Sequence, residues 1–177
     1  MDSNKDIIAS HFYIDLLKNI NSAWKSHFWI YINIIKIVNP RVIVELGTDR
    51  GFSLLAAIFA LSRENINGKV YAIDAWGKDD EDDSVMKTGK ERYLTLRDKM
   101  LPMFIKKYDL SDNRHELVRE YFSDAKHMFT HIDILHIDGN HTYEDCKRDY
   151  EEFKEKINLN NSIIIFHDIA RGKKGTK

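Results

Sequence analysis

An acid and a histidine stand three positions apart where an apolar stretch of the chain ends. Residues 135–145 read LHIDGNHTYED, so Asp138 and His141 follow a run of apolar residues, and Gly139 gives the backbone room to turn. Imidazole gains and loses a proton near neutral pH, which suits it to act as a general base. Two interpretations are open: an ordinary polar turn, or the floor of an active site at the end of a buried strand.

Three further acids occupy the same kind of position. Glu45 lies near the end of RVIVEL, Asp74 ends KVYAID and Asp168 ends NSIIIFHD. Ligands of parallel α/β sheets bind outside the carboxyl ends of the strands. Acids at the ends of four predicted strands therefore indicate a ligand site at that edge. At Asp74 a carboxylate can accept hydrogen bonds from both ribose hydroxyls, a role that dinucleotide and adenosyl ligands share.

The segment VELGTDRGFS joins the first of these strands to the helix that follows. A dinucleotide fingerprint reads G-x-G-x-x-G, and its middle glycine lets the backbone approach a pyrophosphate. Here Asp49 occupies the middle position between Gly47 and Gly51, and Arg50 offsets its charge only in part. An acidic glycine loop suits a ligand with positive charge and no phosphate, such as S-adenosylmethionine. A plain strand-to-helix turn is the alternative.

The elements that must position these side chains alternate along the chain. Apolar residues spaced at three and four over Ile7–Val38, closed by Pro40, predict one or two helices. Beyond them, strands alternating with helices predict a single-domain, doubly wound, Rossmann-like α/β fold with a mostly parallel sheet and helices on both faces. The predicted strands are 41–46, 69–74, 115–120, 131–137 and 161–168, and the predicted helices between them are 51–62, 92–108 and 142–157. We expect an N-terminal helical segment, 1–40, followed by a ligand-binding domain, 41–177.

Some local expectations follow. The charge-dense segment 76–90 predicts a loop, and its acidic run Asp79–Asp83 is either solvated or a lid over the cofactor. Pro102 predicts a kink or break within the helix 92–108. Thr142 predicts the N-cap of the helix that follows it. His136 alternates with apolar strand positions, which predicts a buried, hydrogen-bonded side chain.

Composition excludes several classes of protein. The 177 residues suit one domain, and a net charge of −1 gives no sign of a nucleic-acid partner. The single cysteine, Cys146, excludes an intramolecular disulfide, a cysteine-rich zinc site and an iron–sulfur cluster, and it fits a reducing, cytoplasmic location. The apolar stretch 28–38 falls short of the ~20 residues of a membrane span. We expect a buried helix there, or one through which the chain forms a homo-oligomer.

Together these segments resemble the motifs of class I S-adenosylmethionine-dependent methyltransferases. VELGTDRGFS resembles the first motif, VYAIDAW the second, and LHIDGNHTYED with IIIFHD the fourth- and fifth-strand signatures. The resemblance runs from about Arg41 to Asp168 and is nearest to a branch that includes macrolide sugar O-methyltransferases and methyltransferase domains found beside glycosyltransferases. It implies two more strands and a helix beyond Asp168, so we expect this chain to lack the last strands of the family.

The resemblance also implies roles for individual residues. Asp74 would hold the ribose, and Trp76 or Phe122 would cover the adenine. Further cofactor-binding residues would be Glu45, Gly47, Thr48, Gly51 and Ser53.

In metal-dependent members of the family, acids at the positions of Asp138 and Asp168 bind a divalent cation, and His141 matches the proposed general base. Oxygen ligands favour magnesium or calcium over zinc, and a bound cation lowers the pKa of a hydroxyl. Where those members have an acid before the final aspartate, this sequence has His167. Adjacent strand residues point to opposite faces, so His167 joins Asp168 as a ligand only if the chain twists out of the strand there.

The expected function is therefore an S-adenosylmethionine-dependent O-methyltransferase that acts on a hydroxyl of a sugar or other small polar acceptor, with a divalent cation, most simply magnesium. Two alternatives stay open. One is a non-catalytic adenosyl-binding domain associated with a glycosyltransferase. The other is a nicotinamide-dependent oxidoreductase, against which Asp49 argues.

Overall fold

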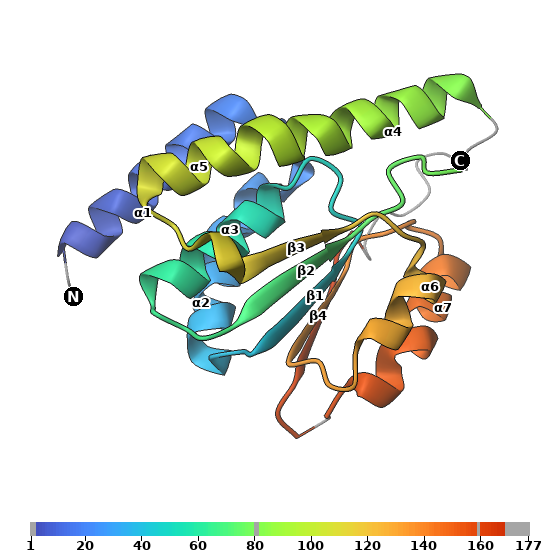
Figure 1. Cartoon of the computed structure of the whole chain (residues 1–177). Helices are drawn as coiled ribbons and strands as arrows, with labels where there is room; N and C mark the ends of the chain where they lie inside the picture. The colour runs from blue at the N-terminus through green and yellow to red at the C-terminus, as the bar shows by residue number, and fades with distance from the viewer. Residues whose placement is uncertain (1–2, 80–81, 159, 169–177) are drawn as a thin grey trace, which may run out of the picture.

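A five-stranded parallel sheet lies between two layers of helices (Figure 1). The computed structural model describes residues 3–79, 82–158 and 160–168. Within them the strand order is β3-β2-β1-β4-β5, and every neighbouring pair is parallel. The expected doubly wound α/β fold is confirmed. The strands are β1 (Val42–Leu46), β2 (Lys69–Ile73), β3 (His115–Val118), β4 (Ile134–Ile137) and β5 (Ile163–Phe166).

The helices cover both faces of the sheet. α1, α2, α3 and α5 lie on one face, α6 and α7 lie on the other, and α4 extends the line of α5 over the carboxyl ends of the strands (Figure 1). The α-helices are α1 (Ser3–Asn19), α2 (Phe28–Val38), α3 (Phe52–Arg63), α4 (Asp83–Thr95), α5 (Leu101–Tyr108), α6 (Phe122–Ala125) and α7 (Tyr143–Phe153). Shorter helical segments are η1 (Ala23–His27), the π-helical η2 (Leu96–Met100), η3 (Asp112–Arg114), η4 (Lys126–Met128) and η5 (Lys154–Lys156).

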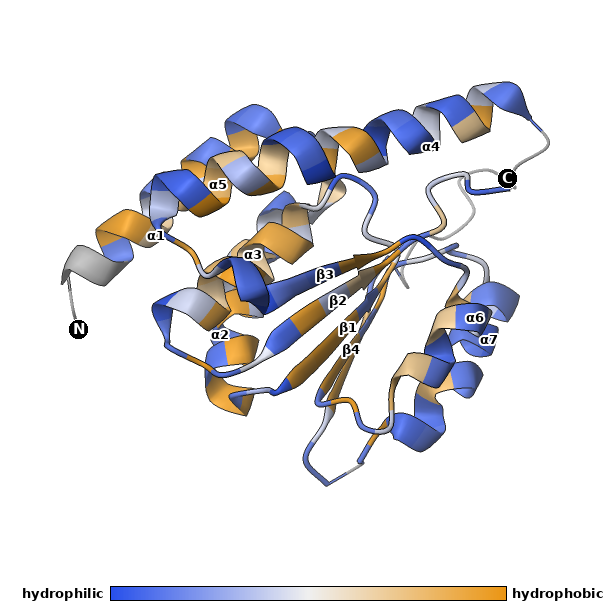
Figure 2. Ribbon diagram, viewed as in Figure 1, coloured by the Kyte–Doolittle hydropathy of each residue, from blue (hydrophilic) through white to orange (hydrophobic). Residues whose placement is uncertain are grey.

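The hydrophobic core is continuous from the sheet to the N-terminal helices. Residues 52–61 of α3 are all buried, because this helix lies between the sheet and the outer helices. Phe12 of α1 stacks on Phe59 of α3 with 4.2 Å between ring centroids. In Figure 2 the strands and α3 are mostly apolar, whereas α7 is mostly hydrophilic. No helix among the described residues is long and apolar enough to cross a membrane.

All five strands end level with one another. The last strand residues are paired across the sheet as one row: Leu46, Ile73, Val118, Ile137 and Phe166. The residues that follow them therefore lie side by side at the carboxyl edge: Gly47, Asp74, Arg119, Asp138 and His167. Backbone hydrogen bonds continue into this row, since the N–H of Asp138 donates to Leu46 at 2.8 Å. The N–H of His167 likewise donates to Ile137 at 3.0 Å.

The prediction of a loop over 76–90 is wrong at its C-terminal end, where α4 begins at Asp83. Asp82 caps this helix, because its carboxylate accepts a hydrogen bond from the backbone N–H of Ser84 at 2.8 Å. No residue of α4 is buried, so the helix has no apolar stripe by which a periodic pattern would reveal it. Residues 80 and 81 of the predicted acidic lid lie outside the described part of the chain.

Of two other local predictions, the N-cap at Thr142 is confirmed and a break at Pro102 is not found. α4, the π-helical η2 and α5 follow one another without a gap, and Pro102 lies in the first turn of α5. Thr142 caps α7, since its hydroxyl oxygen accepts a hydrogen bond from the backbone N–H of Asp145 at 3.1 Å.

Candidate active site

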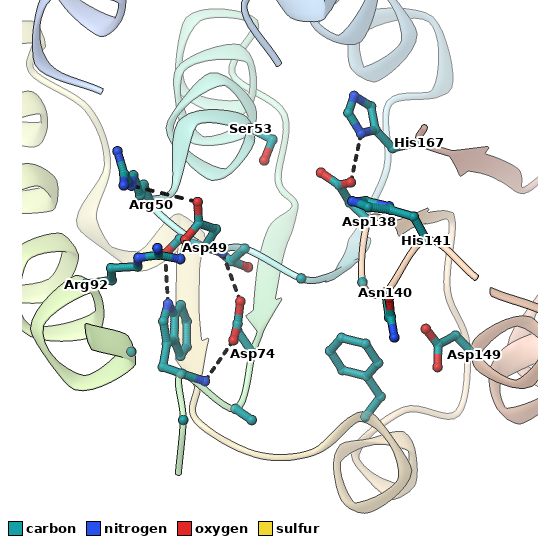
Figure 3. A pocket seen from close by; sticks show the side chains of 18 of the residues that line it. Asp49, Arg50, Ser53, Asp74, Arg92, Asp138, Asn140, His141, Asp149 and His167 are labelled. Atoms are coloured by element: carbon teal, nitrogen blue, oxygen red, sulfur yellow. Dashed lines mark hydrogen bonds and ion pairs between the residues drawn. The ribbon is translucent and has the colours of Figure 1, made fainter. Parts of the chain in front are cut away.

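A cleft of about 1090 Å³ opens at the carboxyl edge of the sheet (Figure 3). Its walls come from the loops after the strands and from η1, α4 and α7. Pockets for drug-sized ligands measure about 300–1,000 Å³. The cleft therefore has room for a cofactor and a small second molecule together.

The glycine loop after β1 packs directly against the loop after β4. Gly47 has a φ of +92°, and a Cβ atom there would lie 2.2 Å from the carbonyl oxygen of Asp138. Both the conformation and the contact require glycine. Gly47 and Thr48 line the cleft. Gly51 lies beneath the lining, where it begins α3 and packs against Leu96 of η2.

Glu45 is fully buried under the glycine loop. Its Oε1 accepts a hydrogen bond from the Ser53 hydroxyl at 2.7 Å, and its Oε2 has no hydrogen-bond partner among the described residues. Burial raises the pKa of Glu45 to about 8, and the charge of Asp138 contributes to the same shift. Glu45 is therefore largely protonated near neutral pH, and a nearby cation would favour its charged form.

Glu45→Gln is expected to remove a pH dependence from the stability of the fold. Because the folded-state pKa lies above the ordinary value of 4.5, folding takes up a proton, and the free energy of unfolding falls as pH rises from 4.5 to about 8. One group contributes a slope of at most about 1.4 kcal/mol per pH unit. Glutamine keeps an acceptor for Ser53 and does not titrate. Urea denaturation across this range measures the slopes, and equal slopes for both proteins would contradict the raised pKa.

Asp74 ties the loops after β1 and β2 together. Its Oδ2 accepts the backbone N–H of Asp49 at 2.9 Å, and its Oδ1 accepts that of Trp76 at 2.8 Å. Burial raises the pKa of Asp74, and these two N–H groups offset part of the shift. Each carboxylate oxygen keeps a second lone pair, so Asp74 can still accept hydrogen bonds from a ligand in the cleft.

The two aromatic residues predicted near a base differ in their surroundings. Trp76 has a φ of +44° and a buried indole, whose Nε1 donates to the carbonyl of Asp49 at 2.8 Å. It lines the cleft as a fixed part of the wall, packed against Tyr93. Phe122 begins α6 and lines the cleft from the other side, against Gly139.

Asp138, His167 and Asp168 meet in one cluster. Each offers one ligand atom, and these atoms lie within 4.8 Å of one another. The Nδ1 of His167 is 2.8 Å from Oδ1 of Asp138 (Figure 3). It is 3.6 Å from Oδ1 of Asp168. His167 stands level with Asp138 on the neighbouring strand, so both side chains point to the same face. The backbone of Asp168, with a φ of +56°, turns out of the strand and brings its carboxylate back to the cluster.

His141 lies beside this cluster, just before the N-cap of α7. Its Nε2 is 3.6 Å from Oδ2 of Asp168. Its side chain is 33% exposed and lines the cleft. The structure therefore brings together the predicted acids, the predicted base and the histidine that precedes the final aspartate.

An aromatic wall from η1 completes this end of the cleft and was not expected. Trp24 stacks on His167 with 5.7 Å between ring centroids, and the ring of His27 meets His167 edge-on at 5.1 Å.

His136 packs between Trp24 and Tyr31. The prediction that His136 is buried is confirmed, but the predicted hydrogen bond is wrong, since neither ring nitrogen has a partner among the described residues. Burial lowers the pKa of His136 to about 3, so the ring is neutral.

Residues 44–169 match a family of methyltransferase domains, over most of the chain. The chain belongs to this family. Solved structures with the same fold include Podospora anserina methyltransferase PaMTH1 with S-adenosylhomocysteine (TM-score 0.56, 15% identity, 90% of this chain and 61% of that one). Another is the O-methyltransferase TomG of Streptomyces achromogenes with S-adenosylmethionine (TM-score 0.55, 15% identity, 94% and 65%). The class I methyltransferase fold is thus confirmed.

A curated relative of this chain is a much longer protein. The uncharacterized protein y4gI of Sinorhizobium fredii is 29% identical over 152 residues, which cover 84% of this chain. The matched region is only 15% of that protein's length. The similarity thus concerns one part of that protein.

Proposed function

We propose that this methyltransferase domain is an S-adenosylmethionine-dependent O-methyltransferase. It acts on a hydroxyl of a sugar or other small polar acceptor and uses a divalent cation, most simply magnesium. The observation that carries the proposal is the meeting of Asp138, His167 and Asp168 beside His141, directly next to the glycine loop. A methyl donor held by that loop would lie next to an acceptor held at the cluster.

The β1 and β2 side of the cleft fits the charges of S-adenosylmethionine. Asp49 and Asp74 line it, and Glu45 lies beneath with an unpartnered oxygen among the described residues. These carboxyl groups suit a ligand with ammonium and sulfonium charges. Nη1 of Arg92 pairs with Asp49 at 2.6 Å, so the charge of Asp49 does not by itself exclude a pyrophosphate, and the ligand titration below decides between the two cofactors. Gly47 lines the cleft, and its close contact with the carbonyl of Asp138 holds the glycine loop beside the cluster.

The cluster fits a divalent cation. Asp138 and Asp168 offer carboxylate oxygens, and His167 adds a nitrogen ligand. When bound there, the cation would supply positive charge for the negative charge that develops on the acceptor oxygen. Asp138 and His167 are held in place by the backbone hydrogen bonds at the ends of β4 and β5, so the donor set is preorganised.

His141 is suited to take the proton from the acceptor hydroxyl. An acceptor oxygen at the cluster lies within reach of its Nε2, which stands 3.6 Å from Asp168. The carboxylate of Asp168 then stabilises the protonated ring. Trp24 of η1 lines the cleft on this side and stacks on His167.

Calorimetric titration with S-adenosylhomocysteine and with NAD tests the cofactor. We expect a response to S-adenosylhomocysteine and none to NAD, and a response to NAD alone would overturn the proposal. Transfer of a labelled methyl group to a panel of hydroxylated acceptors tests the reaction, which should be lost with a chelator and restored by magnesium. Methyl transfer that is unaffected by the chelator would remove the cation from the scheme. Cofactor binding without transfer to any acceptor would favour a non-catalytic adenosyl-binding domain.

A further inference from the structure

A buried carboxylate on α7 has no role in the site described so far. Asp149 is only 2% exposed and lines the cleft, although most of α7 faces solvent. Its Oδ2 has no hydrogen-bond partner among the described residues, and Nη2 of Arg148 lies 3.7 Å from its other oxygen. Burial raises the pKa of Asp149 to about 6. A carboxylate in this position needs a donor, and the cleft is the side from which one can come.

This carboxylate lies close to the edge of the Phe122 ring. A Cβ atom on Gly139 would lie 3.1 Å from Oδ2 of Asp149 and 2.8 Å from Cε2 of Phe122. The carboxylate and the edge of the phenyl ring therefore meet at one point above the Gly139 backbone. Figure 3 shows Asp149 beside Asn140, with its carboxylate directed into the cleft. A hydrogen-bond acceptor next to an aromatic ring suits a planar, nitrogen-rich base.

The proposed cofactor site fixes where such a base would lie. With the methionine end at the glycine loop and the ribose at Asp74, the base extends through the cleft toward Phe122 and Gly139, which line the same cleft. The ends of β2 and β4 are separated by β1, so they lie two strand spacings, about 9.6 Å, apart. That span is comparable with the length of a nucleoside. The outer edge of the base would then lie next to α7.

We propose that Asp149 recognises the adenine of S-adenosylmethionine by accepting a hydrogen bond from its exocyclic amino group, with Phe122 against the base. The inference rests on the proposed function, because it concerns how that cofactor is oriented. A carboxylate can only accept, so Asp149 favours an amino group at the 6-position and disfavours a carbonyl. Asp149 is then a specificity-determining residue for the cofactor.

Calorimetric titration with two ligands tests this role. S-Inosylhomocysteine carries a carbonyl oxygen where S-adenosylhomocysteine has the amino group. We expect the wild-type protein to bind S-adenosylhomocysteine on the order of 10-fold to 100-fold more tightly. Asp149→Asn should bring the ratio of affinities to about one or invert it, because an amide can turn its N–H toward the carbonyl.

A matched control separates this effect from a change of charge. Glu152 lies on the same helix, lines the same cleft and pairs with Lys126 at 3.8 Å. Glu152→Gln should keep the wild-type ratio. If the wild type binds neither ligand, the proposed cofactor is wrong. If it binds S-adenosylhomocysteine and Asp149→Asn keeps the wild-type ratio, only the role of Asp149 is overturned. Equal affinity of the wild type for both ligands also overturns that role, even if the variant fails to fold.

Discussion

Asp138→Asn is expected to lower kcat for methyl transfer by about three orders of magnitude while S-adenosylhomocysteine affinity changes only a few-fold. The substitution removes a negative ligand from the cluster and the carboxylate that Nδ1 of His167 contacts at 2.8 Å. A catalytic cation contributes several kcal/mol, and each 1.36 kcal/mol is about a factor of ten in rate. The measurement is kcat over a magnesium titration. We expect the variant to need far more magnesium or to show no response.

Two other variants make this result specific. Asp98→Asn changes the charge in the same way on η2, where the side chain is about half exposed and lies outside the cleft, so activity should stay at the wild-type level. His141→Ala should lower kcat by about 10²–10⁴-fold and leave the magnesium concentration for half-maximal activity unchanged. A wild-type magnesium response in Asp138→Asn would contradict the assignment of this residue as a ligand.

Gly47→Ala is expected to lower stability and cofactor affinity together. The new Cβ would lie 2.2 Å from a backbone oxygen, which cannot move aside as a side chain can, and the φ of +92° adds strain. Overpacking and strain together cost about 2–5 kcal/mol, which corresponds to roughly 5–15 °C in Tm for a chain of this size. Thermal unfolding and calorimetry with S-adenosylhomocysteine measure the two effects.

Gly139→Ala provides the comparison for this substitution. Its Cβ would meet the ring of Phe122 and the carboxylate of Asp149, both of which are side-chain atoms that can shift. We therefore expect a smaller loss of Tm than for Gly47→Ala. If Gly139→Ala lowers Tm more than Gly47→Ala does, the close backbone contact at Gly47 is not the more constraining of the two.

The position of the site follows from the sequence because it depends on strands alone. β-branched runs predict the strands, and parallel strands present their carboxyl ends at one edge, so the grouping of Asp74, Asp138 and Asp168 is accessible from the pattern. The role of His167 is not accessible in this way. It depends on β5 ending at Phe166 and on the positive φ of Asp168. A strand pattern shows neither, and aspartate only tolerates this conformation more readily than most residues.

Other parts of the site depend on packing between segments distant in sequence. α4 has no buried face, so neither hydropathy nor period reveals it, and only its Asp82 cap was a usable signal. The pattern shows Trp24 only as one more apolar residue in a helical stretch, because its contact with His167 joins segments far apart in the sequence. Asp149 reads as part of a solvated helix face, because a pattern of charges does not show which one is turned inward.

The contact between Gly47 and the carbonyl of Asp138 has a consequence for the two ligands considered together. The loop that would hold the cofactor and the loop that would hold the cation touch through backbone atoms, so a displacement of one displaces the other. The charge on Asp138 also contributes to the raised pKa of Glu45. Occupancy of either site is therefore expected to alter affinity at the other. Thermodynamic linkage then requires the factor by which magnesium changes cofactor affinity to equal the factor by which the cofactor changes magnesium affinity. The cofactor and the cation would then bind cooperatively, each changing the affinity of the protein for the other.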